Sequence, residues 1–442
     1  MTTTIRHQLW QLATVTLDDN WRHDHTVPSR VLYPHQWSWD AGFTAVGLAH
    51  VAPARGWHDL RSLFSAQWSD GRVPHIVFDP NGERDYFPGH RFWRTAEVPG
   101  TPAQPTSGIV QPPVHALAAW ELYRRAGDDP PARATAVAEL RALYPKLVAQ
   151  QRYLAIFRNI GGGGLAALVH PWESGQDNSP AWDRALSAVP GDTRLVPRQH
   201  RRDLAVSEVS HRPTDSDYSR YIAIAQNYRE YGYADDGPGG RYPFLVECPT
   251  FNAIAAAAEH ALAAIAEVVG ADPAPHRQEA ARITTALVAR LYNPATGMFH
   301  ARDLYTDRLS PARCVGGLVP LILPGLPPEV VSGLLAAARS PRFGLSETMA
   351  LPLPSYDRTA PDIDPVRYWR GPIWVNMNWL VWRGLRRHGH LALAAALRTA
   401  VIDMVQRWGC YEYFHAFTGE GIGAVEFSWT AALALDLLAE QD

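Results

Sequence analysis

A loop-like segment in the first half of the chain concentrates acid groups beside aromatic rings. Residues 170–183 read HPWESGQDNSPAWD and place three carboxylates and two tryptophans around a glycine. The run has neither a helical nor a strand-like apolar period, and unpaired carboxylates are costly to bury. Carboxyl groups set against aromatic faces suit the cleavage of a sugar bond. The same residues also fit a simple helix start, with Asp177 or Ser179 as a cap before Pro180.

A second acid stands among aromatic residues near the end of the chain. Residues 411–420, YEYFHAFTGE, contain Glu412 and connect two predicted helices. A surface acid in a turn would give the same pattern. Together with Asp177, however, Glu412 supplies a second carboxylate on a loop between helices. Two opposed carboxyl groups are the minimum machinery for hydrolysing a glycosidic bond.

Tryptophan is abundant, with 16 residues in 442, and many tryptophans stand beside polar residues in loops. Core packing accounts for some of them, such as Trp120 in a helical pattern. An aromatic ring also offers a flat surface for the C–H face of a sugar. We therefore predict sugar platforms among the loop tryptophans, which are Trp37, Trp39, Trp172, Trp182, Trp369 and Trp374.

Helical periods dominate the rest of the chain and predict an all-α fold. Apolar residues recur at helical spacing from Phe251 to Val269, and Gly270 is placed to end that helix. Further helices are predicted within 114–125, 134–157, 218–231, 275–291, 328–338, 372–387, 391–408 and 427–438. Strand-like stretches are few, the best being 73–78 and 165–169. Segments rich in glycine, proline and aromatic residues, including 33–40, 86–90 and 368–372, are predicted to be functional loops between helices.

A set of motifs recurs in one order along nearly the whole chain. They are residues 33–40, 74–78, 111–115, 172–180, 212–215 and 368–374, and Glu412 with 417–419. In this order they make the chain resemble glycoside hydrolase family 63, specifically its bacterial branch of mannosylglycerate and glucosylglycerate hydrolases. Each motif alone is weak evidence, whereas the ordered set is specific.

This resemblance implies a fold and a reaction. The fold would be an (α/α)6 barrel with long inter-helix loops forming the active site at one mouth. Residues 1–442 would form a single catalytic domain, with loop insertions around 66–110 and 158–215 capping the site. The enzyme would hydrolyse an α-glycoside with inversion, releasing glucose or mannose from a small acid such as glucosylglycerate or mannosylglycerate.

The resemblance also assigns roles to individual residues. Asp177 would be the general acid and Glu412 the general base, while Glu173 would support the loop. Positions that match the family's sugar pocket are Tyr33, Trp39, Asp40, Gln111, Gly175, Trp369 and Trp374. Positions that match the surroundings of the glycerate are Tyr86, Arg212, Tyr218 and Tyr368. Trp37, Phe78, Trp172 and Arg370 stand in the same motifs and complete the predicted substrate-binding set. The Arg212 guanidinium would bind the acid's carboxylate; pairing with Asp215 or Asp217 is the structural alternative.

Departures from the branch leave the sugar open. His415-Ala416 replaces an acid and a proline, Phe427 replaces an amide, and residues 375–380 follow the wider family. Glucose and mannose therefore both remain candidates.

Composition excludes several other classes of protein. A net charge of −3 without like-charge runs argues against nucleic acid and anionic membranes as partners. Three separated cysteines predict neither a disulfide framework nor a zinc site, and no metal or cofactor is expected. The N-terminus shows no signal peptide, and no apolar run is long enough for a membrane span. We therefore expect a cytoplasmic protein; its oligomeric state stays open.

Three rival functions can be compared with hydrolysis of a glycosylated acid. A sugar epimerase on a similar helical barrel would use histidines, such as His75 and His115, as acid and base. A non-catalytic sugar-binding relative would normally have lost one carboxylate, yet Asp177 and Glu412 are both present. An α-glucosidase acting on neutral oligosaccharides would have no need for a cation such as Arg212.

Overall fold

Helices make up most of the computed structural model, which describes residues 3–80, 86–192, 194, 196, 201, 203–206, 208–235 and 241–440. The longer helices are α1 (Thr3–Asn20), α2 (Ser38–Val51), α3 (Pro53–Ser65), α5 (His115–Arg125), α6 (Pro130–Phe157), α9 (Asp215–Glu230), α10 (Pro249–Val269), α11 (Ala274–Leu291), α12 (Pro328–Arg339), α13 (Val375–Arg387), α14 (Leu391–Trp408) and α15 (Ser428–Ala439). Short helices are α4 (His90–Trp93), α7 (Asp183–Ser187) and α8 (Asp203–Val206).

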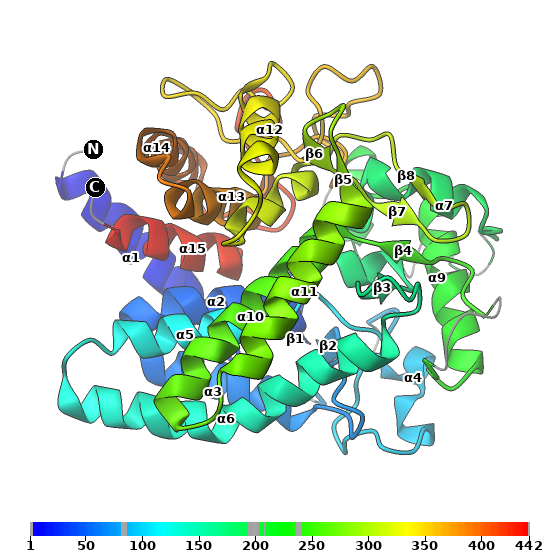
Figure 1. Cartoon of the computed structure of the whole chain (residues 1–442), viewed down its shortest axis with the longest axis horizontal. Coiled ribbons are helices and arrows are strands. Elements are labelled where there is room, and N and C mark those ends of the chain that lie inside the picture. Colours follow the sequence, from blue (N-terminus) through cyan, green and yellow to red (C-terminus); the bar gives the residue numbers. More distant parts are fainter. Residues whose placement is uncertain are drawn as a thin grey trace.

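The inner helices contact one another in a closed ring. In the described part of the chain, α2 contacts α5, α5 contacts α10, and α10 contacts the 3-10 turn η8 (Val319–Ile322). The ring continues from η8 to α13, from α13 to α15, and from α15 back to α2. An outer layer covers it: α3 on α2, α6 on α5 and α10, α11 on α10, α14 on α13, and α1 on α15. Figure 1 shows α10 beside α11, and α1 beside α15 with both chain ends nearby.

Small residues let the inner helices approach closely. A Cβ on Gly47 of α2 would lie 2.2 Å from the Cα of Ala432 in α15, so only glycine permits this crossing. Every residue from Ser38 to Ala49 is buried, since α2 is enclosed by α3, α5 and α15. A helix buried on all sides has no polar face, so its sequence carries no amphipathic period.

The predicted helices are confirmed, with end shifts of a few residues. Gly270 ends α10 in the left-handed conformation at φ 83°, as predicted. Helices α1, α2 and α3 were not predicted. One loop assignment is wrong in part: α2 begins at Ser38, so Trp39 and Asp40 lie in its first turn. The apolar period of α2 is missing because the helix is buried on every side.

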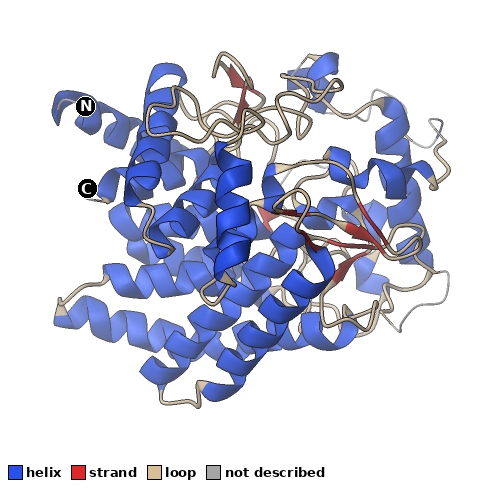
Figure 2. Ribbon diagram, turned by 45° about the horizontal axis from the view of Figure 1, so that its top comes forward, coloured by secondary structure: helices blue, strands red, loops and turns tan. Residues whose placement is uncertain are grey.

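Strands are two residues long and lie mainly among the loops. One sheet has the antiparallel order β3 (Ala167–Leu168), β4 (Val246–Glu247), β7 (Arg302–Asp303) and β8 (Arg308–Leu309). Three antiparallel pairs are β1 (Gln36–Trp37) with β2 (Ile76–Val77), β5 (Tyr292–Asn293) with β6 (Met298–Phe299), and β9 (Tyr413–Phe414) with β10 (Gly421–Ile422). Strands β2 and β3 lie within the two predicted strand regions. Figure 2 shows most of the strands on the side of the molecule away from the chain ends.

Two small apolar cores hold the long loops against the helices. One contains Trp182, Tyr221 and Phe244, and the other contains Trp37, Phe78 and Trp93. Such separate clusters keep long loops in place without extending the main core. Among the described helices, α10 alone is long and apolar enough to cross a membrane; it is a core helix, with 67% of its most apolar stretch buried.

Candidate active site

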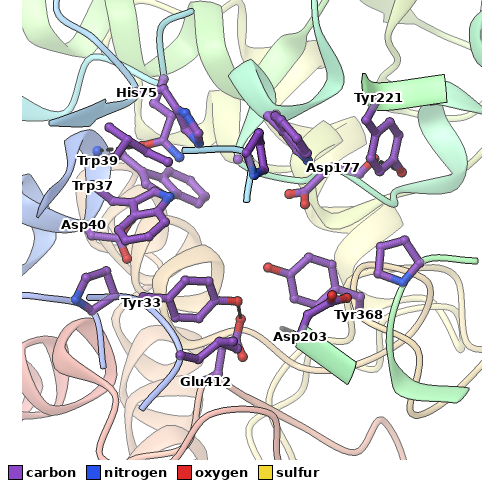
Figure 3. A pocket seen from close by; sticks show the side chains of 18 of the residues that line it. Tyr33, Trp37, Trp39, Asp40, His75, Asp177, Asp203, Tyr221, Tyr368 and Glu412 are labelled. Atoms are coloured by element: carbon purple, nitrogen blue, oxygen red, sulfur yellow. Dashed lines mark hydrogen bonds between the residues drawn. The ribbon is translucent and has the colours of Figure 1, made fainter. Parts of the chain in front are cut away.

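One cavity of about 140 Å³ collects most of the residues singled out from the sequence. The first turns of α2 and α15 face it, and loops from both halves of the chain complete its wall. Figure 3 shows side chains from these distant segments pointing into the same space. Of the predicted residues, the wall contains Tyr33, Trp37, Trp39, Asp40, Tyr86, Gln111, Trp172, Gly175, Asp177, Tyr218, Tyr368 and Glu412.

Asp177 lies on the acid-rich loop between two 3-10 turns. The first, η2 (Pro171–Ser174), ends at Gly175, and the second, η3 (Pro180–Trp182), is capped by the Ser179 hydroxyl. Ser179 thus caps a helical turn, as the helix-start interpretation predicts, and Asp177 faces the cavity. The Tyr221 hydroxyl donates to the Asp177 backbone carbonyl at 2.8 Å and fixes the loop.

The Asp177 and Glu412 carboxyls enter the cavity from opposite sides (Figure 3). Removal from bulk water raises the pKa of Asp177 to about 7, and the negative charge of Glu412 adds to the rise. Arg212 opposes this shift through its positive charge. A carboxyl with this pKa is substantially protonated near neutral pH, so Asp177 can donate a proton.

Glu412 is buried and held by three groups. Its Oε1 accepts the Tyr33 hydroxyl at 2.7 Å, and its Oε2 accepts the Ala424 backbone N–H at 3.0 Å. The Arg212 Nη2 donates to Oε2 at 2.8 Å. Gly423 makes room for this carboxylate, because a Cβ there, at φ 80°, would lie 2.5 Å from Oε2. Glu412 is thus a fixed, charge-compensated carboxylate.

Arg212 is not part of the cavity wall, contrary to the position expected for it. Its guanidinium pairs with Glu412 and lies over the Tyr368 ring, 4.9 Å from the centroid. The structural alternative of pairing with Asp215 or Asp217 is not what the structure shows either; Arg201 pairs with Asp215 at 3.0 Å. The sequence could not reveal a pair between residues 200 positions apart.

Gly175 allows the acid loop to pass directly over Trp39. Its φ is 68°, and a Cβ would lie 2.4 Å from the Trp39 ring. Glycine is needed for both reasons, since other residues adopt this conformation at a cost and would strike the ring. The loop that carries Asp177 is therefore seated on an aromatic residue of α2.

Glu173 supports the acid loop and does not line the cavity, as expected. It is fully buried, and Arg158 donates to both of its oxygens, at 2.7 and 2.8 Å. The same carboxylate accepts the Val169 backbone N–H at 2.8 Å. Arg158 also bonds Asp235, which in turn pairs with Arg72 at 3.1 Å. This buried network ties the loop to α6 and to the segment before β2.

Four other predicted residues lie behind the wall. Trp369 and Trp374 stack on each other, with centroids 3.8 Å apart, and Trp369 is tilted toward Trp39. Arg370 pairs with Asp183 at 2.8 Å. Phe78 is buried against His35. Through stacking or an ion pair, these four side chains thus support the residues that face the cavity.

The sequence analysis did not assign six further polar or aromatic wall residues to the substrate site. They are His75, Phe87, Asp203, Tyr221, Phe427 and Trp429. Phe427 and Trp429 lie at the start of α15. Because this predicted helix begins next to the predicted site, their position could have indicated that they face the cavity. Asp203 and Tyr221 gave no such signal, because they lie in α8 and α9 and only the tertiary fold brings these helices to the cavity.

The histidines that an epimerase would use do not suit acid–base chemistry. His75 stacks on Trp172, and burial lowers the pKa of its imidazole to about 3. His115 is fully buried, bonds the Ser38 carbonyl at 2.9 Å and does not line the cavity. A neutral His75 cannot act as an acid near neutral pH. Among the described residues, no group of three or more potential ligands could hold a metal ion.

Comparison with known protein families agrees with this geometry. Residues 33–430 match the mannosylglycerate hydrolase MGH1-like glycoside hydrolase domain. The chain belongs to this family of glycoside hydrolases.

Named relatives of this glycoside hydrolase align over nearly their whole length. The mannosylglycerate hydrolase of Rubrobacter radiotolerans is 38% identical over 97% of this chain and 96% of its own. That of Thermus thermophilus is 40% identical over 96% and 99%. The glucosylglycerate hydrolase of Mycolicibacterium hassiacum is 35% identical over 93% and 94%.

Solved structures of this glycoside hydrolase family also match this chain over nearly its whole length. A family 63 mannosylglycerate hydrolase of Thermus thermophilus, in complex with Tris and D-glycerate, has a TM-score of 0.87 at 39% identity, covering 97% of this chain and 99% of that one. Its complex with glucose has a TM-score of 0.84 at 40% identity and the same coverage.

Proposed function

We propose that this glycoside hydrolase releases glucose or mannose from glycosylglycerate with inversion at the anomeric carbon. The observation that carries the proposal is the pair Asp177 and Glu412, opposed across one cavity in different electrostatic surroundings. The substrate class is supported by relatives that act on mannosylglycerate and glucosylglycerate. A cavity of about 140 Å³ suits a small substrate better than a polymer.

Inversion needs one proton donor and one base on opposite faces of the sugar ring. Asp177, with a pKa of about 7, protonates the leaving oxygen. Glu412, fixed by Tyr33 and Arg212, removes a proton from a water that attacks the other face. The sugar lies between them on Trp39 and beside Asp40, a buried carboxyl whose pKa burial raises well above its usual range. Asp40 in its neutral form can donate a hydrogen bond to a sugar hydroxyl.

The aglycone would lie on the side of Asp177 that faces away from the sugar. The phenols of Tyr86 and Tyr218 line the cavity near Asp177, whose charge acts on both, and offer hydroxyls to the glycerate. Arg212 contributes positive charge to this region, since its field reaches Asp177 as well as Glu412. Its guanidinium thus serves the base directly and attracts an anionic aglycone.

The surrounding fold is proposed to be an (α/α)6 barrel. The closed ring of α2, α5, α10, η8, α13 and α15 supports this, together with the outer helices that cover it. Residues 1–442 then act as a single catalytic domain. The described parts of the segments 66–110 and 158–215 cap the site, and both contribute wall residues, among them His75 and Asp177; residues 81–85, 193, 195, 197–200, 202 and 207 lie outside the described residues.

A substrate panel combined with NMR tests the proposal. Purified enzyme is incubated with glucosylglycerate, mannosylglycerate and a neutral α-glucoside, and the released sugar is assayed in all three reactions. Early proton NMR spectra should show the β-anomer first from an α-linked substrate. Appearance of the α-anomer first contradicts inversion, and cleavage of the neutral substrate alone contradicts the acidic aglycone.

Two variants and a matched control assign the reaction to the site. Asp177→Asn and Glu412→Gln should each abolish turnover without unfolding the protein. Glu420→Gln changes an exposed acid in the same loop as Glu412 and should retain full activity. An active Asp177→Asn enzyme would remove the assignment of the acid.

A further inference from the structure

A second cavity, of about 590 Å³, lies at the far end of three helices that begin beside the active site. Helix α15 starts at the active-site wall with Trp429 and reaches this cavity with Asp436 and Glu440. The last turns of α5 and α13 also line it. Residues seven to eleven apart on one helix are separated by roughly 10–16 Å, so the two cavities are distinct.

Arginine is concentrated in the lining of this second cavity, which includes five arginines and three carboxylates. Glu121 is shared by two of them, Arg124 at 3.0 Å and Arg383 at 2.7 Å. Glu440 is likewise shared, by Arg125 at 2.7 Å and by Arg386. Four of the five arginines are thus paired with Glu121 or Glu440.

The third carboxylate adds no capacity for another cation. Asp436 is buried and accepts Arg125 at 3.2 Å and His50 at 2.9 Å. The Trp379 indole N–H also donates to it, at 2.8 Å. Its oxygens are therefore fully engaged by Arg125, His50 and Trp379.

Arg387 and His260 face the same cavity without a carboxylate partner among the residues that the structure describes. Burial and the charge of Arg387 lower the pKa of His260. Arg387 is exposed overall, but partial desolvation and the charge of Arg383 still lower its pKa. Both groups thus lie in a positive field that an anion would relieve.

We propose that the second cavity binds a small phosphorylated molecule, with its phosphate group at Arg387 and His260. A guanidinium presents parallel N–H donors that match phosphate oxygens, and an imidazole adds a further donor. The volume is within the range of small-molecule sites. Trp120, Trp382 and Leu391 add apolar atoms to the lining for the rest of the ligand. The site is separate from the hydrolytic one and takes a different class of ligand.

Helix ends offer a competing explanation for the arginines. Helices α5 and α13 end at this cavity, and cations in a last turn stabilise the partial negative charge of a helix C-terminus. That role predicts stabilisation by Arg387 with no response to phosphate. A binding site predicts a response to phosphate that depends on Arg387.

Titration calorimetry of the full chain with inorganic phosphate and pyrophosphate, at constant ionic strength, separates these explanations. Wild-type protein should bind both anions, and each should raise Tm. Arg387→Gln should weaken binding at least about tenfold, the effect of losing one charge-assisted hydrogen bond. His260→Gln should weaken it in the same direction.

Two controls locate the binding. Arg152→Gln removes an exposed arginine on the outer helix α6 and should leave phosphate affinity unchanged. Asp177→Asn should also leave it unchanged, because the hydrolytic site is not involved. The proposal is overturned if wild-type protein binds neither anion, or if Arg387→Gln binds them as tightly as wild type. A lower Tm of Arg387→Gln that is equal with and without phosphate would leave only the helix-end role.

Discussion

The guanidinium of Arg212 and the carboxylate of Glu412 form an ion pair that is closed to solvent. Nη2 lies 2.8 Å from Oε2, and the two side chains are 2% and 1% exposed. A buried carboxylate without its partner would carry an uncompensated charge. Arg212, which was expected to recognise the leaving acid, therefore holds the carboxylate that is proposed to be the base.

Replacing Arg212 tests this double role. Arg212→Met should reduce kcat/KM at least about tenfold on a neutral α-glucoside as well as on glycosylglycerate, because both reactions need Glu412. The loss on glycosylglycerate should be larger, since the attraction for an anionic aglycone disappears too. Steady-state kinetics on both substrates measure the two losses. Unchanged activity on the neutral substrate would confine Arg212 to the aglycone.

The pH dependence of activity should report the acid. Because the pKa of Asp177 is raised to about 7, the proton donor is present below this pH and is lost above it. We expect kcat/KM to fall about tenfold per pH unit on the alkaline side of about pH 7. Asp40→Asn removes the other carboxyl of the described cavity lining whose pKa is raised, and it should leave that limb in place, whatever its effect on rate. A limb that moves with Asp40→Asn would assign the titration to Asp40.

The same pKa shift predicts an effect on stability. A carboxyl with a pKa near 3.9 when unfolded and about 7 when folded binds more protons in the folded state between these values. Its contribution to stability therefore declines as pH rises from about 4 to 7 and stays at its lowest above 7. Asp177→Asn removes this cost, so its Tm should exceed that of wild type above pH 7. Scanning calorimetry at pH 5 and pH 8 measures the difference; an equal Tm difference at the two pH values would contradict it.

Local sequence signals recovered the helices with one apolar face and the loops between them. Helix α10 is typical, with an apolar period and a C-terminal glycine that both appear in the structure. Helix α2 was missed because it is buried on every side and has no polar face. Helix α3 did carry a period, through Trp57, Leu60 and Leu63, and could have been found. Helix α15 is also buried from Ser428 to Leu438, yet a helix was predicted at 427–438, so burial on every side weakens the signal without removing it.

The site could be predicted residue by residue where motifs were continuous in sequence. Asp177 and Glu412 line the cavity because each stands in a loop that long-range contacts bring to the same end of the helices. The pairing of Arg212 with Glu412 and the position of Trp369 behind the wall depend on those contacts. No local sequence pattern encodes these two positions, since the Arg212 and Trp369 side chains could equally have faced the substrate.

Gly175 should be sensitive to the smallest possible substitution. Gly175→Ala places a methyl group 2.4 Å from the Trp39 ring at φ 68°, so the loop or the ring must move. The left-handed conformation costs about 1–2 kcal/mol and the clash about 1–3 kcal/mol more. Turnover should fall at least about tenfold because Asp177 shifts with the loop.

Gly232 provides a matched control for this substitution. Its φ is 62°, but a Cβ there would meet nothing within 4 Å. Gly232→Ala should therefore cost only the backbone energy and retain full activity. Urea unfolding and kcat/KM for both variants separate strain from displacement. Equal effects of the two substitutions on activity would mean that the contact with Trp39 does not position the acid.

The buried pair of Arg158 and Glu173 should determine how firmly the acid loop is held. Arg158 serves two carboxylates, Glu173 and Asp235. Arg158→Met leaves Glu173 without a cation, while Asp235 keeps Arg72, and it should destabilise the protein by about 3–5 kcal/mol. Glu173→Gln keeps its side-chain shape and leaves Arg158 paired with Asp235, so its cost should be smaller. The exposed pair of Arg277 with Glu267 provides the control, and Arg277→Met should leave the urea midpoint nearly unchanged. Urea unfolding followed by circular dichroism measures all three. A cost for Glu173→Gln equal to that of Arg158→Met would mean that Asp235 does not share the arginine, and the loop would then depend on Glu173 alone.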